Sequence, residues 1–317
     1  MGRVTIVLVT WNSARYLPRC LEGILQQTQR DFELLVVDNA SADDSVAILA
    51  PHATRIIRND TNRGFSAAVN QAITVANGEL LLVVNPDCYL LPEYIERVAK
   101  MFDDPTVGSA TGKLIRARGY EIEPTNEIDS MGIRMTRTGR HLDLHQGKRD
   151  EVIANPFEVF GVSGAAAMFR TSFLRDVTID GEALDEDFFA YREDADLAWR
   201  GRVLGWRSMC EPNAIAYHVR RVTPEARREL PSDVNMHSVK NRFLLRLKNE
   251  GLYLALRNAP FELARDLVVI VAALTIERTS LPAFPWLWKN RRRVLAKRRE
   301  IQRRRKVRDH ELARWFR

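Results

Sequence analysis

The sequence predicts an α/β protein with a mostly parallel central sheet flanked by helices, followed by a helical extension at the carboxyl end. Strand-like apolar runs alternate four times with helical patterns in the first ninety residues, which is typical of parallel βαβ units. From about residue 234 the pattern becomes wholly helical. We therefore divide the chain into a first unit over residues 1–232 and a second unit over residues 233–317.

The elements of the first half follow from local patterns. Short apolar runs bounded by turn formers predict strands, and apolar positions repeated every three or four residues predict helices. The expected strands are Val4–Thr10, Phe32–Val37, Arg55–Arg58 and Leu80–Asn85. The expected helices are Ala14–Gln27, Ser45–Leu49 and Phe65–Ala76.

The later elements are less regular. Residues 105–160 lack clear periodicity, and we expect irregular chain there, with two short strands and a mobile loop around Gly119–Gly147. A tight turn and strand follow at Phe160–Arg170, and a helix begins near Glu193 and ends at Gly205. Two more strands are expected at Trp206–Cys210 and Ala214–Tyr217, then helices from Val234, from Asn258 to Ile276, and from Trp286 to Phe316.

Asp87 is the first candidate site residue. Pro86 cannot donate to a sheet ladder, so the fourth strand should end at Asn85 and leave Asp87 in the loop beyond. Open α/β sheets bind their ligands at that edge. The carboxylate suits Mg²⁺ or Mn²⁺ bridging a diphosphate. A cap for the helix that starts near Pro92 explains Asp87 equally well, so both interpretations stay open here.

The turn after the first strand disfavours a dinucleotide site. Dinucleotide-binding folds carry G-x-G-x-x-G at this position, whereas the segment from Thr10 to Ala14 contains no glycine. Hydride transfer of the usual kind is therefore not expected. Asp38 ends the second strand, where a carboxylate can accept a hydrogen bond from a ribose hydroxyl or a base N–H, although a helix cap is an equally ordinary role.

An acid-rich stretch is the densest signal in the chain. Six carboxylates lie within twelve residues, interleaved with Phe188, Phe189 and Tyr191. Acids suit the first turn of the helix that begins near Glu193, but this does not account for the whole set. Aromatic side chains can wall a sugar-sized pocket and leave one carboxylate to take a proton. His218, just past the last strand, is either structural or a metal or phosphate partner.

Six segments together resemble the family 2 glycosyltransferases of the GT-A fold, most closely the rhamnosyltransferase-like bacterial members. The resemblance covers about residues 3 to 250, with the segments in the family's order. They are Val9–Asn12, Val36–Ser41, Asn62–Asn70, Asn85–Asp87, Gly164–Met168 and Asp187–Leu197.

The resemblance implies a role for each matching residue. Asp194 would be the catalytic base, and Asp87, completed by His218, would bind the Mg²⁺ or Mn²⁺ ion that bridges the donor diphosphate. The donor would be held by Thr10, Trp11, Asn12, Asp38, Asn62, Arg63, Gly64 and Asn85. The acceptor or sugar pocket would be formed by Gly164, Ala165, Asp187, Tyr191 and Glu193.

One position departs from the family pattern. Asn85 stands where the usual D-x-D motif has its first carboxylate, so the metal site would be less negative. Asn-Pro-Asp is common among the rhamnosyltransferase-like members, and this favours dTDP-rhamnose as the donor.

The resemblance implies an inverting enzyme that transfers a sugar from a nucleotide-diphospho donor to a saccharide or polyprenyl-linked acceptor in cell-envelope polysaccharide synthesis. The alternative is a non-catalytic, membrane-peripheral protein that binds nucleotide-sugars or acts as a scaffold. The Glu193–Asp194 pair argues against that alternative, because a pure binder needs no base.

Charge is distributed unevenly along the chain. Residues 289–317 hold fourteen Lys and Arg against three acids, a balance of +11, so residues 1–288 sum to −4 of the +7 total. A basic helix with sparse apolar residues fits an anionic membrane interface, a solvated or partner-binding helix, or a nucleic-acid arm. Paired tryptophans near Pro285 favour the membrane. Removal of residues 289–317 is expected to leave nucleotide binding intact, because all candidate site residues precede them.

The remaining composition fits a cytoplasmic protein that is peripheral on the inner face of the cell membrane. Three cysteines without metal-ligand spacing fit a reducing compartment, and no signal peptide is expected. The longest uncharged apolar run, Leu267–Ile276, is half of the ~20 residues that a membrane span needs. We expect no nucleic-acid partner, and the sequence leaves a homodimer open.

Overall fold

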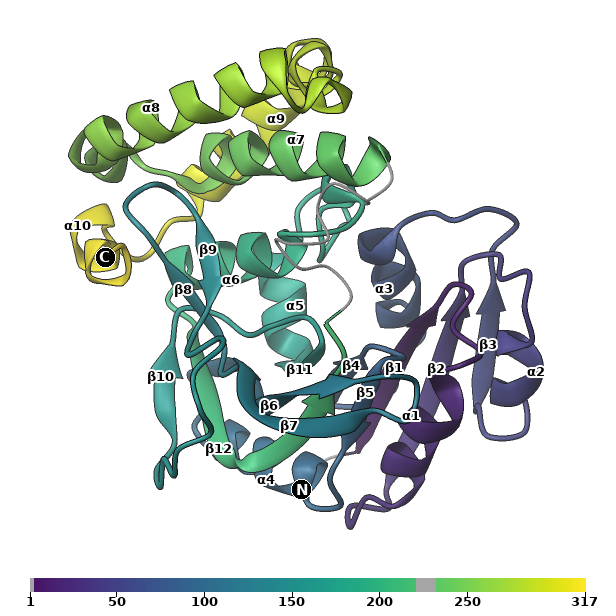
Figure 1. Ribbon diagram of the computed structural model, residues 1–317. Helices are drawn as coiled ribbons and strands as arrows, with labels where there is room; N and C mark the ends of the chain where they lie inside the picture. Colours follow the sequence, from purple (N-terminus) through teal and green to yellow (C-terminus); the bar gives the residue numbers. More distant parts are fainter. Residues whose placement is uncertain (1–2, 221–231) are drawn as a thin grey trace.

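The computed structural model describes residues 3–220 and 232–317 and shows a central sheet between layers of helices (Figure 1). Along the sheet the strand order is β10-β12-β6-β11-β4-β1-β2-β3. Strands β3, β2, β1 and β4 run parallel, which confirms the predicted α/β class. The elements of this half are β1 (Val4–Thr10), α1 (Leu17–Leu25), β2 (Phe32–Asp38), α2 (Ser45–Leu49), β3 (Arg55–Arg58), α3 (Phe65–Ile73), β4 (Leu80–Val84), β5 (Cys88–Leu90), α4 (Tyr94–Ala99) and the 3₁₀ turn η1 (Lys100–Asp103).

Alternate residues of the parallel strands feed two separate cores. Ile6, Val36 and Leu82 pack with α1, α2 and α4 on one face, whereas Val7 and Val83 pack with α3 on the other. Because helices cover both faces of the sheet, the sequences of these strands are continuous apolar runs and do not alternate between apolar and polar residues.

The second half of the sheet corrects the expectation for residues 105–160. This region contains β6 (Val107–Arg118), β7 (Glu123–Ser130), β8 (Ile133–Met135), β9 (His141–Asp143) and β10 (Phe157–Val159). Strand β6 lies between β11 (Ala166–Arg170) and β12 (Arg207–His218) and pairs with both, while β7 pairs with β6. The predicted mobile loop around Gly119–Gly147 was therefore wrong, because β7 pairs with the preceding strand β6 and β8 pairs with β9, so backbone pairing orders most of it.

Strand β12 replaces the two strands expected at 206–210 and 214–217. The register shifts between Glu211 and Ile215, and the irregularity accommodates Pro212 without ending the strand. Its last residue, His218, lies opposite Cys88 of β5. The helices that follow β11 are α5 (Thr171–Val177), the 3₁₀ turn η2 (Glu186–Phe188) and α6 (Glu193–Val203).

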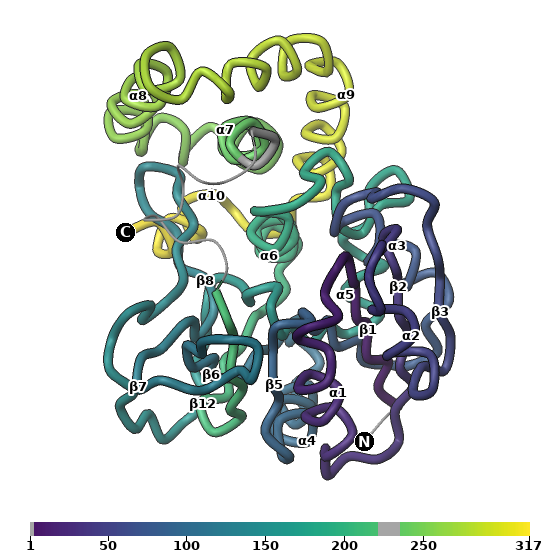
Figure 2. Tube along the Cα trace, turned by 45° about the vertical axis from the view of Figure 1, so that its right-hand side comes forward, coloured from purple at the N-terminus to yellow at the C-terminus, as the bar shows by residue number. Residues whose placement is uncertain are grey.

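The carboxyl-terminal region is helical, as predicted, and it packs on the first unit. It contains α7 (Ser232–Asn249), α8 (Leu252–Thr275), η4 (Arg278–Ser280), α9 (Ala283–Arg303), α10 (Asp309–Leu312) and η5 (Ala313–Trp315). Trp199 of α6 is fully buried in one apolar cluster with Leu244, Ile301 and Phe316. Figure 2 shows α9 running from the level of α8 down past α6 to α10.

Two helix boundaries differ from the expectation. Helix α8 starts at Leu252 rather than Asn258, and Pro260 stays inside it at an exposed position. The final helix ends at Arg303, because the next residues leave it to donate from Lys306 and Val307 to the carbonyl of Val203. Within the described residues, no single helix is long and apolar enough to cross a membrane, and α8 passes such a test only together with the following segment Arg278–Arg303, bent by 109°.

Candidate active site

A pocket of about 370 Å³ lies at the carboxyl ends of β4 and β12. The second half of the acid-rich stretch and the loops after β4 and β12 meet there, although they are far apart in the sequence. Figure 1 shows the ends of β4 and β12 within one sheet. The pocket is lined by Phe65, Asn85, Asp87, His141, Asp143, Ser163, Gly164, Ala165, Ala190, Tyr191, Arg192, Glu193, Asp194, His218 and Arg220.

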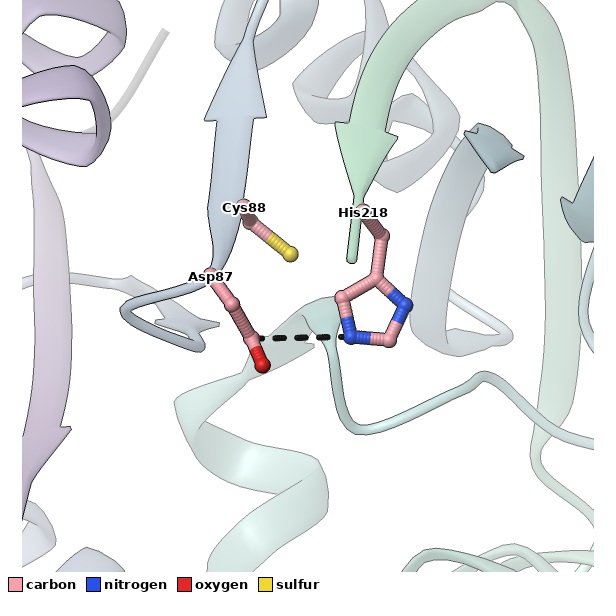
Figure 3. Close-up of side chains that lie close together, drawn as sticks. All are labelled: Asp87, Cys88 and His218. Atoms are coloured by element: carbon pink, nitrogen blue, oxygen red, sulfur yellow. Dashed lines mark ion pairs between the residues drawn. The ribbon is translucent and has the colours of Figure 1, made fainter. Parts of the chain in front are cut away.

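One corner of the pocket has the donors of a metal site. Asp87, Cys88 and His218 each offer a ligand atom within 4.8 Å of the others, and Figure 3 shows Asp87 and His218 facing each other across a short gap. Oδ1 of Asp87 lies 3.6 Å from Nε2 of His218. This oxygen is buried and makes no hydrogen bond within the described residues, so it retains a lone pair for a cation.

The surroundings favour Asp87 and His218 as ligands over Cys88. Burial raises the pKa of the Cys88 thiol well above its usual value, and Asp87 adds to this effect, whereas a thiol binds metal as the thiolate. The Sγ atom of Cys88 instead lies 3.2 Å from the carbonyl of Ala165. A carboxylate oxygen and an imidazole suit Mn²⁺, and the carboxylate also suits Mg²⁺, so the residues present fit a divalent cation.

A buried carboxylate fixes the imidazole of His218 from behind. Nδ1 of His218 lies 2.8 Å from Oδ2 of Asp129, which also accepts from Arg220. Such a partner on the second ring nitrogen orients metal-binding histidines. Burial alone would lower the pKa of His218, but hydrogen bonds and charges of Asp129 and Asp87 outweigh it and raise the pKa to about 10. The ring is therefore protonated at neutral pH without a metal, and a cation on Nε2 would displace that proton.

Across the pocket, α6 begins with Glu193 and Asp194. The backbone N–H groups of Gly164 and Ala195 donate to the two oxygens of Asp194, at 3.2 and 2.7 Å. Burial, then the charge of Asp143, raises the pKa of Asp194 to about 6, although these two hydrogen bonds oppose the rise.

Glu193, directly before Asp194, is also a buried carboxylate with a raised pKa. Its Oε2 atom is buried and makes no hydrogen bond within the described residues. Burial, then the charge of Asp194, raises the pKa of Glu193 to about 8. Two adjacent buried carboxylates with raised pKa values titrate as a pair, so the pair can exchange a proton near neutral pH.

The loop that leads into α6 is held in an unusual backbone conformation. Phe189, Tyr191 and Arg192 have φ values of 64°, 68° and 73°, in the left-handed region that costs non-glycine residues free energy. Asn241 of α7 holds this loop. Its side-chain amide donates to the carbonyls of Phe188, Ala190 and Tyr191, at 3.0, 2.9 and 2.7 Å.

The other carboxylates of the acid-rich stretch serve the fold. Asp185 and Asp196 are buried and pair with Lys248 of α7, and Asp185 also pairs with Lys297 of α9. Asp187, which the resemblance assigned to the acceptor pocket, is not among the described residues that line the pocket. Its carboxylate turns to α9 and pairs with Lys297 and Arg293, because those cations compensate its burial.

The predicted donor residues lie along the same sheet edge, beside the pocket rather than in it. Thr10 and Asp38 end adjacent strands and are buried, whereas Trp11 is exposed. Oδ1 of Asn12 accepts from the N–H of Ala42, and Ser41 donates its N–H to Asp38. These bonds stabilise the two strand-end loops.

Residues 62–64, the third segment predicted to bind the donor, connect this edge of the sheet to the loop that precedes α6. The side chain of Asn62 accepts from the N–H of Gly64, and Arg63 is exposed. Gly64 has a φ of 84°, and a Cβ there would lie 2.6 Å from the ring of Phe189. The N–H of Phe65 donates to the carbonyl of Phe189. Asn85 is the one predicted donor residue that lines the pocket.

Sequence reasoning missed several residues of the site. Asp129, His141 and Asp143 lie in the region read as irregular, and nothing in their spacing marks them. Arg220 could have been found, because it is two residues after His218 and so falls on the same face of extended chain. Asn241 carried no local signal, since its partners are about fifty residues away.

The order of the sheet, its covering helices and its strand-edge pocket are those of a GT-A fold. The structure of GalNAc-T7 with UDP, GalNAc and Mn²⁺ matches with a TM-score of 0.62 at 14% identity, over 78% of this chain and 48% of that one. The mannosyltransferase PcManGT from Pyrobaculum calidifontis, in complex with GDP-Man and Mn²⁺, matches with a TM-score of 0.56 at 19% identity, over 96% and 84% of the two chains.

The chain belongs to glycosyl transferase family 2, whose family pattern matches residues 5–178, more than half of the sequence. One relative is the putative glycosyltransferase EpsH of Bacillus subtilis (strain 168), which is 28% identical over 138 residues, 42% of this chain and 38% of that protein. The chain spans about a third of the length of the curated relatives it matches.

Proposed function

We propose that the protein is an inverting glycosyltransferase that moves a sugar from a nucleotide-diphospho donor to a saccharide or lipid-linked acceptor. One observation carries this proposal: Asp194, with its pKa raised to about 6, shares a single pocket with the cation-type corner at Asp87 and His218. Such a transfer needs a base that accepts the proton of the acceptor and a cation site that neutralises the donor diphosphate, and both would lie in this one pocket.

The residues of this chain supply the proton transfer and the positioning. Asp194 accepts the proton of the acceptor hydroxyl, whose oxygen then attacks the anomeric carbon as the bond to the donor diphosphate breaks. The N–H groups of Gly164 and Ala195 hold the carboxylate in place for this step, and such positioning supplies much of the rate. Asp87 and His218 would hold Mg²⁺ or Mn²⁺, which when bound neutralises charge on the diphosphate.

The donor lies along the loops that end β1 and β2 and follow β3, with Asn85 at the boundary to the pocket. The exposed ring of Trp11 offers a stacking surface for a base, and Asp38 accepts from the base or ribose. UDP and GDP-Man are bound by the two GT-A structures named above. The segment Asn85-Pro86-Asp87 supports dTDP-rhamnose as the donor of this enzyme, through its resemblance to rhamnosyltransferase-like members.

The acceptor and the cellular setting follow from the same proposal. A lipid-linked acceptor fits an enzyme of cell-envelope polysaccharide synthesis that works in the cytoplasm, at the inner face of the cell membrane. Its sugar would enter beside Tyr191 and Gly164, which line the pocket opposite the corner at Asp87.

A donor-binding and turnover experiment tests the proposal. Nucleotide-sugars are screened by thermal shift with Mg²⁺ or Mn²⁺, where a ligand at ~100 times its Kd adds roughly 2.7 kcal/mol. The best donor is then used for transfer with Asp194→Asn. We expect this variant to keep the thermal shift and to lose roughly 10²–10⁴-fold in kcat. A variant that transfers at the wild-type rate, or a wild-type protein that binds donors but transfers to no saccharide or lipid-linked acceptor, would overturn the proposal.

A further inference from the structure

Helix α8 carries its charged side chains inward and its apolar side chains outward. Glu262 and Asp266 point to α7, where Arg246 pairs with both and Arg242 pairs with Asp266. Every residue of α8 that is exposed to solvent is uncharged. Six exposed residues fall on one stripe at helical spacing, Leu252, Leu256, Leu263, Leu267, Val271 and Leu274, which we name the α8 face.

This arrangement is the reverse of a helix on a water-soluble surface, which turns its charges outward. The ion pairs with α7 fix the rotation of α8, so the outward position of the stripe is built into the fold. The stripe spans the 23 residues from Leu252 to Leu274, about 33 Å at a rise of 1.5 Å per residue. Leu256 is 70% exposed and Leu267 64% exposed. A continuous apolar surface of this extent marks an interaction site.

The charges that follow α8 along the chain indicate the partner. Arg278 follows α8, and Lys289, Arg291 and Arg292 are exposed in α9. Trp288 is also exposed, and the guanidinium of Arg291 lies 4.1 Å from its ring centroid. An apolar helix face followed along the chain by an exposed tryptophan and exposed cations fits a membrane interface that contains anionic lipid.

A second copy of the chain fits the same surface less well. In a two-fold interface each copy presents the same patch to the other. The α8 face of a second copy would bring no acid to the cations that follow α8, because the exposed residues of α8 are all uncharged. Charge complementarity therefore favours an anionic bilayer.

The α8 face is also connected to the pocket. Arg137 donates to the carbonyl of Arg257 of α8, and Arg242 of α7 donates to the carbonyl of Thr138. Three residues further along this hairpin, His141 begins β9 and lines the pocket. Three residues span at most about 10 Å, so this hairpin connects the inner side of α8 with the pocket.

We propose that α8 lies in the plane of an anionic membrane surface, with the α8 face in the acyl region and Trp288, Lys289, Arg291 and Arg292 among the headgroups. The role of this surface in presenting a lipid-linked acceptor rests on the proposed function, but the docking itself does not. The inference shifts membrane attachment from the basic residues 289–317 as a whole to α8, since several of those cations, Lys297 and Arg304 among them, bond within the protein.

Co-sedimentation of the full chain with vesicles tests the docking without any assay of transfer. Vesicles of phosphatidylcholine, with and without phosphatidylglycerol, are compared for the wild type and for the variant Leu256→Glu/Leu263→Glu/Leu267→Glu. We expect the partition coefficient on anionic vesicles to fall by at least about 100-fold in this variant. The matched control is Val152→Glu, an apolar position that is 95% exposed and distant in the sequence, and it should sediment like the wild type.

A second variant separates the charges from the apolar face. Lys289→Gln/Arg291→Gln/Arg292→Gln should lose about 100-fold on anionic vesicles and little on neutral ones. Thermal unfolding of each variant confirms that it folds, and light scattering against concentration gives its mass. The docking is overturned if the wild type stays in the supernatant, if the leucine variant sediments unchanged, or if the wild type is a dimer that the leucine substitutions dissociate without any vesicle binding.

Discussion

Replacing Asn241 with leucine is expected to slow turnover about 10²-fold without unfolding the protein. Two N–H donors of Asn241 serve three carbonyls of the loop before α6. Loss of two hydrogen bonds costs about 1–3 kcal/mol. The loop contains three left-handed residues that need external support, so it should relax and shift the base at the start of α6. A shift of about 1 Å costs about 10²-fold in rate.

The assay measures kcat, KM for the donor and the pH dependence of kcat, together with thermal unfolding. Asn241→Asp is the sharper variant, because it keeps the shape and places a carboxylate against three carbonyls. If donation matters, Asn241→Asp is slower than Asn241→Leu, whereas a pure packing role gives the reverse order. Asn235→Leu is the control on the same helix, since among the described residues its amide donates to Thr279 alone, at 3.5 Å. Equal kcat in wild type and Asn241→Leu would refute the reasoning.

The remaining predictions concern the metal corner, the base and the buried ion network. Asp87→Ala should weaken binding of the nucleoside diphosphate and remove most of its dependence on Mg²⁺ or Mn²⁺ in calorimetry; wild-type binding that chelator leaves unchanged would contradict a metal role. Asp143→Asn should move the acid limb of the pH profile of kcat to lower pH, because the base must be ionised and the charge of Asp143 helps to raise the pKa of Asp194. An acid limb at the wild-type pH would show that Asp143 does not influence the pKa of the base. Lys297→Met should cost about 1–3 kcal/mol in chemical denaturation, because Asp185 and Asp187 each lose one of the cations that pair with them and keep Lys248 and Arg293, whereas exposed Lys289→Met should cost little, and similar losses in both would argue against the network.

The parallel half of the fold could be predicted because its information is local. Leu80–Val84 is buried on both faces, so an apolar run between turn formers suffices to mark the strand. Pro86 then places Asp87 at the sheet edge. The residues that the resemblance assigned to the metal corner and to the base, Asp87, His218 and Asp194, do meet in one pocket.

The antiparallel half could not be predicted, because its information is not local. Strand β6, Val107–Arg118, lies between β11 and β12, which come much later in the chain, and the polar strand β7 in turn pairs with β6. Tertiary pairing overrides strand propensity in such cases. Asp129 gains its role only from His218, 89 residues further along the chain.

The roles of the carboxylates in the acid-rich stretch could not be predicted from the sequence either. Composition indicated that this stretch had an unusual function, but it could not divide catalytic from structural carboxylates. That division depends on cations in α7 and α9. Asp185 forms ion pairs with Lys248 and Lys297, and Asp187 forms ion pairs with Lys297 and Arg293. Only the carboxylates that lack such partners remain for chemistry.

Deletion of residues 289–317 should therefore destroy the fold rather than release an independent catalytic unit, contrary to the expectation from the charge count. The deletion removes Ile301 and Phe316 from the apolar cluster around the fully buried Trp199. It also leaves Asp187 without its described cationic partners, Arg293 and Lys297. Each large buried side chain removed costs about 2–5 kcal/mol, so two of them with the ion pairs approach the 5–15 kcal/mol of a typical domain. Circular dichroism and thermal unfolding of the truncated protein measure this directly, with Arg317→Ala as a control for the exposed end. A truncated protein that unfolds cooperatively near the wild-type temperature and still binds the donor would show that the first unit is autonomous.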